Sequence, residues 1–346
     1  MRKGLARTVF LNRRSHLRAG WRVIAYALIV AMIGLTAAGV SRLLRGNADA
    51  RVSEAGDDFS TWRSTLGFFI IDAILVLGAC VALRFIDRRP IALLGLSVTR
   101  RCARELALGA CLGAGAIVVS CVSMWAAGAL VVTPGTAHET WSVGLMWYTA
   151  AFLVAAACEE LIMRGYPFQA VVEGLGTPLA VLVFGLVFGL GHMTNSGFSA
   201  VGLATTSISG VMMSVAYLRT RSLWLPIALH FSWNWTQGCL WGMNVSGLVV
   251  TSSFLKTTPA GTALLNGGDF GAEGSVITLV VGIALTLSIW KAPWLTPSEK
   301  NARLWLPYLP RSTESTLDRS DPGGVLAAGG GTGGVESHPE GAAQPG

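Results

Sequence analysis

Residues 147–169 read "WYTAAFLVAAACEELIMRGYPFQ", and this stretch decides the class of fold. Its first twelve residues hold no charged side chain and suit a helix surrounded by lipid. Glu159, Glu160 and Arg164 then follow where such a helix should still be running. Ionisable residues inside a membrane are energetically expensive and mark candidate functional positions. The stretch therefore predicts a membrane helix that carries a polar site.

The composition of the whole chain agrees with a membrane protein. Of the 346 residues, 52% are hydrophobic and only 13% are charged, which is typical of polytopic helical membrane proteins and argues against a soluble fold. The net charge of +7 does not indicate nucleic-acid binding, because the basic residues sit in short loops between apolar runs. The six cysteines show neither disulfide nor metal-ligand spacing, so we expect them to be core residues.

Long apolar runs predict an all-α bundle of about eight transmembrane helices. The predicted helices cover residues 22–41, 66–86, 105–132, 144–173, 177–194, 199–218, 222–243 and 276–290. Arginines and lysines gather in the N-terminal segment, in the loop after residue 86, around 219–221 and after residue 290. Since basic loops stay in the cytoplasm, both termini are predicted to be cytoplasmic.

The positions of the apolar runs and of the basic loops divide the chain into regions. The predicted regions are a basic cytoplasmic segment (1–21), N-terminal transmembrane helices (22–132), a motif-bearing helical region (144–245), an external loop (246–275), a last transmembrane helix (276–290) and a disordered glycine-rich tail (310–346). The tail has too few apolar residues to fold. We expect the loop 246–275, including Asp269 and Glu273, to be a turn-rich cap rather than part of a site. Asp72 in the second helix is expected to be hydrated or structural.

The two adjacent glutamates are predicted to have different roles. Glu159 and Glu160 point about 100° apart around a helix. Arg164 follows Glu160 by four residues, the spacing that places opposite charges on one helix face. Glu160 can therefore be neutralised within its own helix, which leaves Glu159 as the carboxylate available for chemistry.

Two histidines on the following helices are candidates to join Glu159. The turn "EGLGTP" makes the fourth and fifth helices an antiparallel hairpin, in which Glu159 and His192 both lie about 25 Å from the turn. Phe188 lies one helical turn before His192, where it can form a wall of the site. His230 and Asn234 share one face of the seventh helix. For each histidine, a purely structural hydrogen-bonding role is the simpler alternative.

Together these side chains suit hydrolysis by an activated water. A carboxylate partly stripped of water is a good general base near neutral pH, and a neighbouring histidine can orient the nucleophile. A second histidine with an amide side chain can stabilise the oxyanion that forms on an attacked carbonyl. No serine or cysteine nucleophile is needed.

Glu159-Glu160 with Arg164, Phe188 with His192, and His230 with Asn234 resemble the three motifs of the CPBP family. These proteins are CAAX-protease and bacteriocin-processing intramembrane endopeptidases, also called Abi proteins, and the resemblance covers about residues 144–245. It implies that Glu159 and His192 activate water and that His230 and Asn234 stabilise the oxyanion. It also implies that Glu160 and Arg164 support the site.

The substrate implied by this resemblance is a membrane-associated peptide or protein, with membrane lipid as the other partner and no nucleic acid. The short loops and glycine-rich tail favour a prokaryotic chain in the bacterial inner membrane, which makes a prenylated substrate doubtful. We expect no cofactor. Zinc is the alternative, because Glu159, His192 and His230 could supply three ligands and leave an open position for water.

Other function classes have recognisable signatures. The sequence lacks HExxH, GxSxG and GxGD, the motifs of zinc, serine and aspartyl intramembrane proteases. A proton-coupled transporter could relay protons through the same acids and histidines, but it would favour broken helices in repeated halves, which the sequence does not show. A non-catalytic scaffold of the same family would be expected to lack a motif residue.

Overall fold

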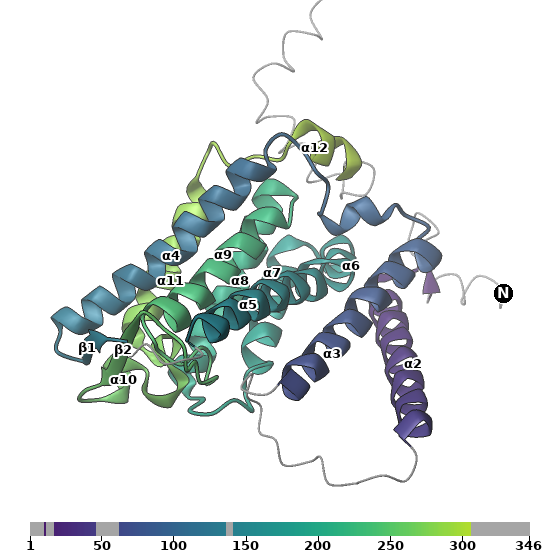
Figure 1. The fold of residues 1–346 in the computed structure, drawn as a ribbon. Helices are drawn as coiled ribbons and strands as arrows, with labels where there is room; N and C mark the ends of the chain where they lie inside the picture. Colours follow the sequence, from purple (N-terminus) through teal and green to yellow (C-terminus); the bar gives the residue numbers. More distant parts are fainter. Residues whose placement is uncertain (1–9, 12–16, 46–61, 136–140, 306–346) are drawn as a thin grey trace, which may run out of the picture. The chain divides into compact units, whose positions relative to one another are not determined.

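The protein was analysed as a computed structural model that describes residues 10–11, 17–45, 62–135 and 141–305. The expected tail at 310–346 lies outside the described residues, as does most of the expected basic segment 1–21. Most of the described chain is helical, which confirms the predicted helical membrane bundle (Figure 1).

The long helices follow one another in chain order. They are α2 (Ala19–Arg45), α3 (Trp62–Val81), α4 (Cys102–Ala126), α5 (Trp141–Arg164), α6 (Tyr166–Leu175), α7 (Thr177–Leu190), α8 (Ala200–Thr220), α9 (Trp224–Trp235) and α11 (Val276–Lys291). The short helices are α10 (Ala263–Asn266), α12 (Glu299–Trp305), the π-helical turns η1 (Ala82–Ile86) and η3 (Thr236–Leu240), and the 3-10 turns η2 (Ile91–Leu94), η4 (Gly268–Phe270) and η5 (Ala272–Gly274).

Five described stretches are long and apolar enough to cross a membrane. They are Ala19–Thr36, Phe69–Ile86, Cys102–Ala126, Trp141–Leu175 and Ala200–Thr220. The helices α7 and α11 are apolar but shorter. The predicted count of eight spans and the cytoplasmic position of both termini stay predictions.

The structure corrects three predicted helix boundaries. The helix expected over 144–173 is broken at Gly165 into α5 and α6, because Pro167 has no N–H to donate and its ring conflicts with the carbonyl four residues earlier. The helix expected over 105–132 ends at Ala126, and Gly128 adopts a left-handed conformation there. The helix expected over 177–194 ends at Leu190.

A small sheet closes one end of the bundle and was not predicted. The strands β1 (Leu130–Pro134) and β2 (Leu255–Pro259) pair antiparallel, with Leu130 opposite Pro259. The first strand follows directly from the early end of α4, and its β-branched residues suit a strand. The pairing ties the segment after α4 to the predicted external loop.

The core lies where α9 packs along α4 and where α8 packs along α7 and α11 (Figure 1). Glycines allow α4 and α9 to approach closely. A Cβ atom added at Gly109 would lie 2.5 Å from the carbonyl oxygen of Leu225, and one at Gly113 would lie 2.2 Å from that of Leu229. Small residues at such positions let membrane helices pack by van der Waals contact.

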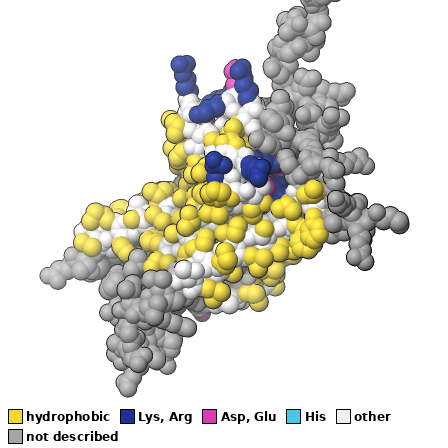
Figure 2. All heavy atoms as spheres, turned by 90° about the vertical axis from the view of Figure 1, so that its right-hand side faces the viewer, with side chains coloured by type: hydrophobic (Ala, Val, Ile, Leu, Met, Phe, Trp, Pro, Cys, Tyr) yellow, Lys and Arg dark blue, Asp and Glu magenta, His cyan; other side chains and the backbone are white. Residues whose placement is uncertain are grey.

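The segments predicted to face the cytoplasm meet at one end of the bundle. The backbone N–H of Leu223 donates to Gly95 O at 2.9 Å, and the Arg101 side chain donates to Thr296 O at 2.9 Å. Figure 2 shows lysine and arginine side chains at the end that carries α12, above a face covered largely by hydrophobic side chains. The sheet of β1 and β2 lies at the opposite end (Figure 1). The cytoplasmic position of the basic end stays a prediction.

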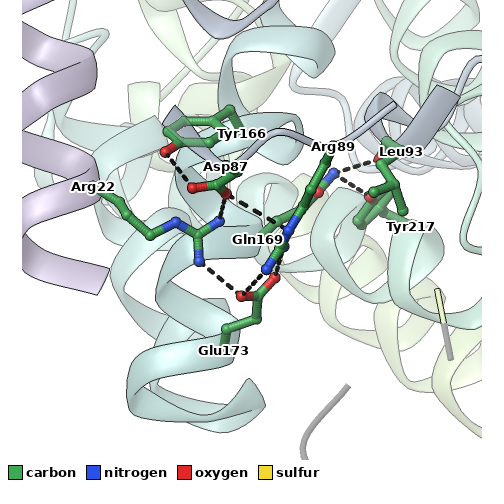
Figure 3. A network of polar contacts seen from close by, with 8 residues as sticks. All are labelled: Arg22, Asp87, Arg89, Leu93, Tyr166, Gln169, Glu173 and Tyr217. Atoms are coloured by element: carbon green, nitrogen blue, oxygen red, sulfur yellow. Dashed lines mark hydrogen bonds and ion pairs between the residues drawn. The ribbon is translucent and has the colours of Figure 1, made fainter. Parts of the chain in front are cut away.

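A buried polar network joins α2 to α6 at the end with the basic loops (Figure 3). Arg22 of α2 contacts Asp87, which follows η1, and donates to Glu173 of α6 at 2.7 Å. Arg89 also donates to Glu173 through both of its terminal nitrogens, and the Nη2 to Oε2 distance is 3.0 Å. Tyr166 donates to Asp87 at 3.3 Å. The network therefore fixes the α2–α3 pair against the helix that continues α5.

Candidate active site

The sequence-predicted site residues gather around one cavity of about 460 Å³. The lining includes Glu159 from α5, Phe188 from α7, His192 from the turn after α7, and His230 and Asn234 from α9. Glu159 and His192 thus line the same space, as the hairpin geometry predicts. Glu160 and Arg164 do not line the cavity but lie directly behind its wall, with fully buried side chains.

Glu160 and Arg164 form the buried support of the site. The Arg164 Nη1 donates to Glu160 Oε1 at 3.1 Å, the contact predicted from their spacing. Arg164 also donates to the carbonyl oxygen of Gly210 in α8 at 2.6 Å, and its guanidinium lies 5.2 Å from the Phe188 ring centroid. A buried charge is stable only when it is paired, and Glu160 and Arg164 neutralise each other here, although Glu160 Oε2 and Arg164 Nε make no hydrogen bond in the described part of the chain.

Glu160 also orients His230, a contact that the sequence did not predict. The Nδ1 of His230 lies 3.1 Å from Glu160 Oε1, so Nδ1–H donates to the carboxylate. This fixes the ring with its other edge toward Glu159, whose Oε2 lies 4.0 Å from His230 Nε2. Glu160 therefore holds one edge of the imidazole by a hydrogen bond, and Glu159 faces the other edge without one. The side chain of Glu160 is 0% exposed, whereas that of Glu159 is 36% exposed and faces the cavity.

His192 is held by the end of its own helix. Its Nδ1 donates to the carbonyl oxygen of Phe188 at 2.8 Å, which leaves Nε2 of the neutral ring as a hydrogen-bond acceptor. The Phe188 ring lies between the two imidazoles, with centroids 5.0 Å from His192 and 5.8 Å from His230. Phe188 therefore spaces the two histidines, in addition to forming a wall as predicted.

Asn234 is available to a ligand. Its side chain lines the cavity one turn after His230. Within the described part of the chain, the side-chain amide makes no hydrogen bond or ion pair. An amide donor held next to an imidazole on one helix face can bind an oxygen atom that develops negative charge.

The structure corrects the expected role of Glu273. The sequence placed it in a cap outside the site, whereas Glu273 is buried and lines the cavity. Its Oε2 accepts hydrogen bonds from the N–H of Ser246 at 2.7 Å and from the Ser246 hydroxyl at 2.6 Å. Its Oε1 accepts from Trp233 Nε1 at 3.2 Å, next to Asn234. The loop holds a second acid, Asp269, so the sequence carried no signal that singled out Glu273 for this role.

Ser246 links Glu273 to the turn that holds His192. The carbonyl oxygen of Ser246 accepts a hydrogen bond from Asn195 Nδ2 at 2.7 Å, and the N–H of Asn195 donates to His192 O at 3.0 Å. Asp72 of α3 also lines the cavity, although a hydrated or structural role was expected for it. Both findings extend the site beyond the helices that carry the motifs.

The zinc alternative would need three ligands converging on one point. Among residues 17–45, 62–135 and 141–305, no group of three histidine, cysteine or acidic side chains is arranged to hold a metal ion. The Nδ1 atoms of His192 and His230 are engaged as donors to Phe188 and Glu160, respectively. A histidine that binds zinc through Nε2 commonly donates its Nδ1–H to a carbonyl or carboxylate oxygen, so these two contacts fit a zinc ligand as well as a metal-free base.

Residues 140–236 match the family model described as Rce1-like, type II CAAX prenyl endopeptidase Rce1-like. The matched segment contains all seven sequence-predicted site residues, and it confirms the resemblance inferred from the motifs. No curated protein and no solved structure matches the chain. The family match supports a membrane peptide hydrolase of the CAAX-protease kind. The helices α2, α3, α4 and α11 lie outside the matched segment.

Proposed function

We propose that this protein is an intramembrane endopeptidase that hydrolyses a peptide bond of a membrane-associated peptide or protein. The observation that carries the proposal is the gathering of Glu159, His192, His230 and Asn234 around one cavity within an apolar bundle. The family match over residues 140–236 supports the same class of reaction. The bacterial inner membrane is the proposed location.

In the proposed reaction, Glu159 and the Nε2 of His192 accept hydrogen bonds from a water molecule. The water oxygen attacks the carbonyl carbon of the substrate peptide bond while Glu159 takes one of its protons. His192 is suited to orient this water because Phe188 holds its other nitrogen as a donor.

Attack on the carbonyl produces a tetrahedral intermediate with a negative oxygen. Asn234 Nδ2 donates to that oxygen, and His230 Nε2 donates to it when the ring is an imidazolium. The hydrogen bond from His230 Nδ1–H to Glu160 supports that form of the ring. The proton on Glu159 then passes to the leaving nitrogen, the C–N bond breaks, and a carboxylic acid and an amine are released.

The decisive test compares the wild-type protein with Glu159→Gln in detergent micelles. A library of quenched membrane-anchored peptides should be cleaved by the wild type, and Glu159→Gln should lower the rate by at least a thousandfold because the amide cannot take up the proton. An unchanged melting temperature of Glu159→Gln would show that the fold is intact. Retained turnover in this variant would refute the role of Glu159.

The variant Glu299→Gln is a matched control. Glu299 is an exposed acid in α12, paired with Arg303 and remote from the cavity. The same substitution there should leave cleavage unchanged. Equal loss of activity in both variants would indicate a general effect of removing an acid, and it would contradict the proposed chemistry.

A further inference from the structure

The wall of the cavity that α3 contributes is a row of three residues. Phe69, Asp72 and Leu75 are spaced three residues apart, which places them on one face of α3, and all three line the cavity. The row presents one carboxylate between two hydrophobic side chains. It belongs to a helix outside the segment matched by the family model.

Asp72 has no partner of its own among the residues that the structure describes. It makes no hydrogen bond or ion pair there, in contrast to Glu160 and Glu273, whose carboxylates accept two or more hydrogen bonds each. An unpartnered carboxylate in an apolar bundle is costly, and a cation that enters the cavity would relieve this cost.

Acids are the only permanently charged type of side chain in the described lining of the cavity. Three acids line it, Asp72, Glu159 and Glu273, and its lining contains neither lysine nor arginine. Low-dielectric walls strengthen the field of these acids, so the cavity attracts positive charge. Glu273 is engaged by Ser246 and Trp233, and Glu159 faces His230, which leaves Asp72 as the acid free to receive a cation.

Asp72 lies beside the proposed water-activating group. Asp72 comes from α3 and Glu159 from α5, two helices that pack against each other, and both side chains line the same cavity. The two carboxylates are near enough to act on each other electrostatically. A cation that meets Asp72 is therefore bound on the side of the cavity next to Glu159.

We infer that Asp72 is a specificity-determining residue that receives the lysine or arginine side chain of a substrate next to the cleaved bond. The aliphatic part of that side chain would pack on Phe69 and Leu75 while its charged end meets Asp72. This inference rests on the proposed function, because it names the substrate class of the same cavity. Neither leaving group nor proton of the hydrolysis passes through Asp72.

The test separates binding from cleavage. Three membrane-anchored peptides of equal length carry lysine, norleucine or glutamate at one position, which is moved stepwise across the cleavage site. Binding is measured by fluorescence anisotropy to the Glu159→Gln protein, with or without Asp72→Asn. Micelles of an uncharged maltoside detergent are used, so that no cationic lipid headgroup competes.

At one position of the series, the lysine peptide should bind at least tenfold more tightly than the norleucine peptide, and glutamate should bind most weakly. Asp72→Asn should abolish this preference without changing the binding of the norleucine peptide. Asp72→Lys should reverse it in favour of glutamate. Asp269→Asn, which removes an exposed acid that does not line the cavity, should keep the lysine preference.

An equal lysine preference in the presence and absence of the Asp72 carboxylate would overturn the inference. Absence of any lysine preference at every position would do the same. Selective binding of lysine without cleavage by the wild type would uphold the subsite and contradict the proposed function. Cleavage by the wild type without any preference for lysine would support the proposed function and contradict the Asp72 subsite. The two proposals can therefore fail independently.

Discussion

The Nδ1 atom of His230 lies 3.1 Å from the Oε1 atom of Glu160, and the same oxygen accepts a hydrogen bond from Arg164. The buried carboxylate of Glu160 thus accepts hydrogen bonds from an arginine of its own helix, α5, and from a histidine of α9. The second glutamate of the pair, Glu159, remains half exposed to the cavity on the other edge of the same imidazole. This division assigns support to Glu160 and chemistry to Glu159.

Glu160→Gln should both unfold more easily and lose activity. It leaves the buried Arg164 without a counter-charge, which costs about 3 kcal/mol or more in the free energy of unfolding. Chemical or thermal unfolding in detergent, together with the cleavage rate, measures the two effects. Glu299→Gln removes an exposed acid at the same spacing from an arginine and should leave stability unchanged. Equal stability of both variants would contradict the buried support.

Asn234→Ala should lower kcat about 100-fold with little change in KM, because the amide stabilises the transition state more than the bound substrate. Steady-state kinetics on a cleaved peptide measures both constants. Asn244→Ala is the control, since the side chain of Asn244 donates to Asp269 O and does not line the cavity. A change confined to KM would assign Asn234 to substrate binding instead.

Glu273→Gln should reduce kcat through the turn that carries His192. The substitution replaces a carboxylate that accepts from Ser246 and Trp233 with an amide that must also present hydrogens. A double-mutant cycle of Glu273→Gln with Ser246→Ala should show strongly non-additive losses, as expected for residues in contact. Additive losses would mean that the two residues act on the site independently.

Glu173→Gln should loosen the attachment of α2 and α3 to α6. Both Arg22 and Arg89 donate to this carboxylate, and a neutral amide cannot balance them (Figure 3). Hydrogen exchange followed by mass spectrometry should show faster exchange in α2 near Arg22 than in the wild type. Unchanged exchange there would indicate that apolar packing of α2 suffices to hold it.

Cleavage should persist in the presence of a strong chelator, and the purified active protein should contain zinc at well below one equivalent. The expectation follows from the suitability of Glu159 as a metal-free base and from the described residues, which hold no group of three histidine, cysteine or acidic side chains placed to bind a metal ion. Elemental analysis and a chelator titration test it. Loss of activity that is restored by added zinc would establish the metal-dependent alternative.

The helical membrane class, the Glu160–Arg164 pair and the residues of the cavity on α5, α7 and α9 follow from the sequence. These features depend on two properties that can be read within a single helix. They are the mean hydropathy over the length of a membrane span and the 3.6-residue period of the α-helix. The break at Gly165 also has a local cause in Pro167, although the apolar pattern continues through it and conceals the boundary.

The sequence by itself determined which residues face one another along a helix and which kind of chemistry they can support. Only the tertiary structure decided that Glu160 holds His230, that Glu273 at the far end of the loop 246–275 folds back onto Ser246, and that Asp72 of α3 lines the cavity. These contacts join residues about 30 to 90 positions apart in the sequence. Which residues meet depends on how the helices pack and on the paths of the loops between them. No local period encodes that information, because packing is a property of the whole bundle.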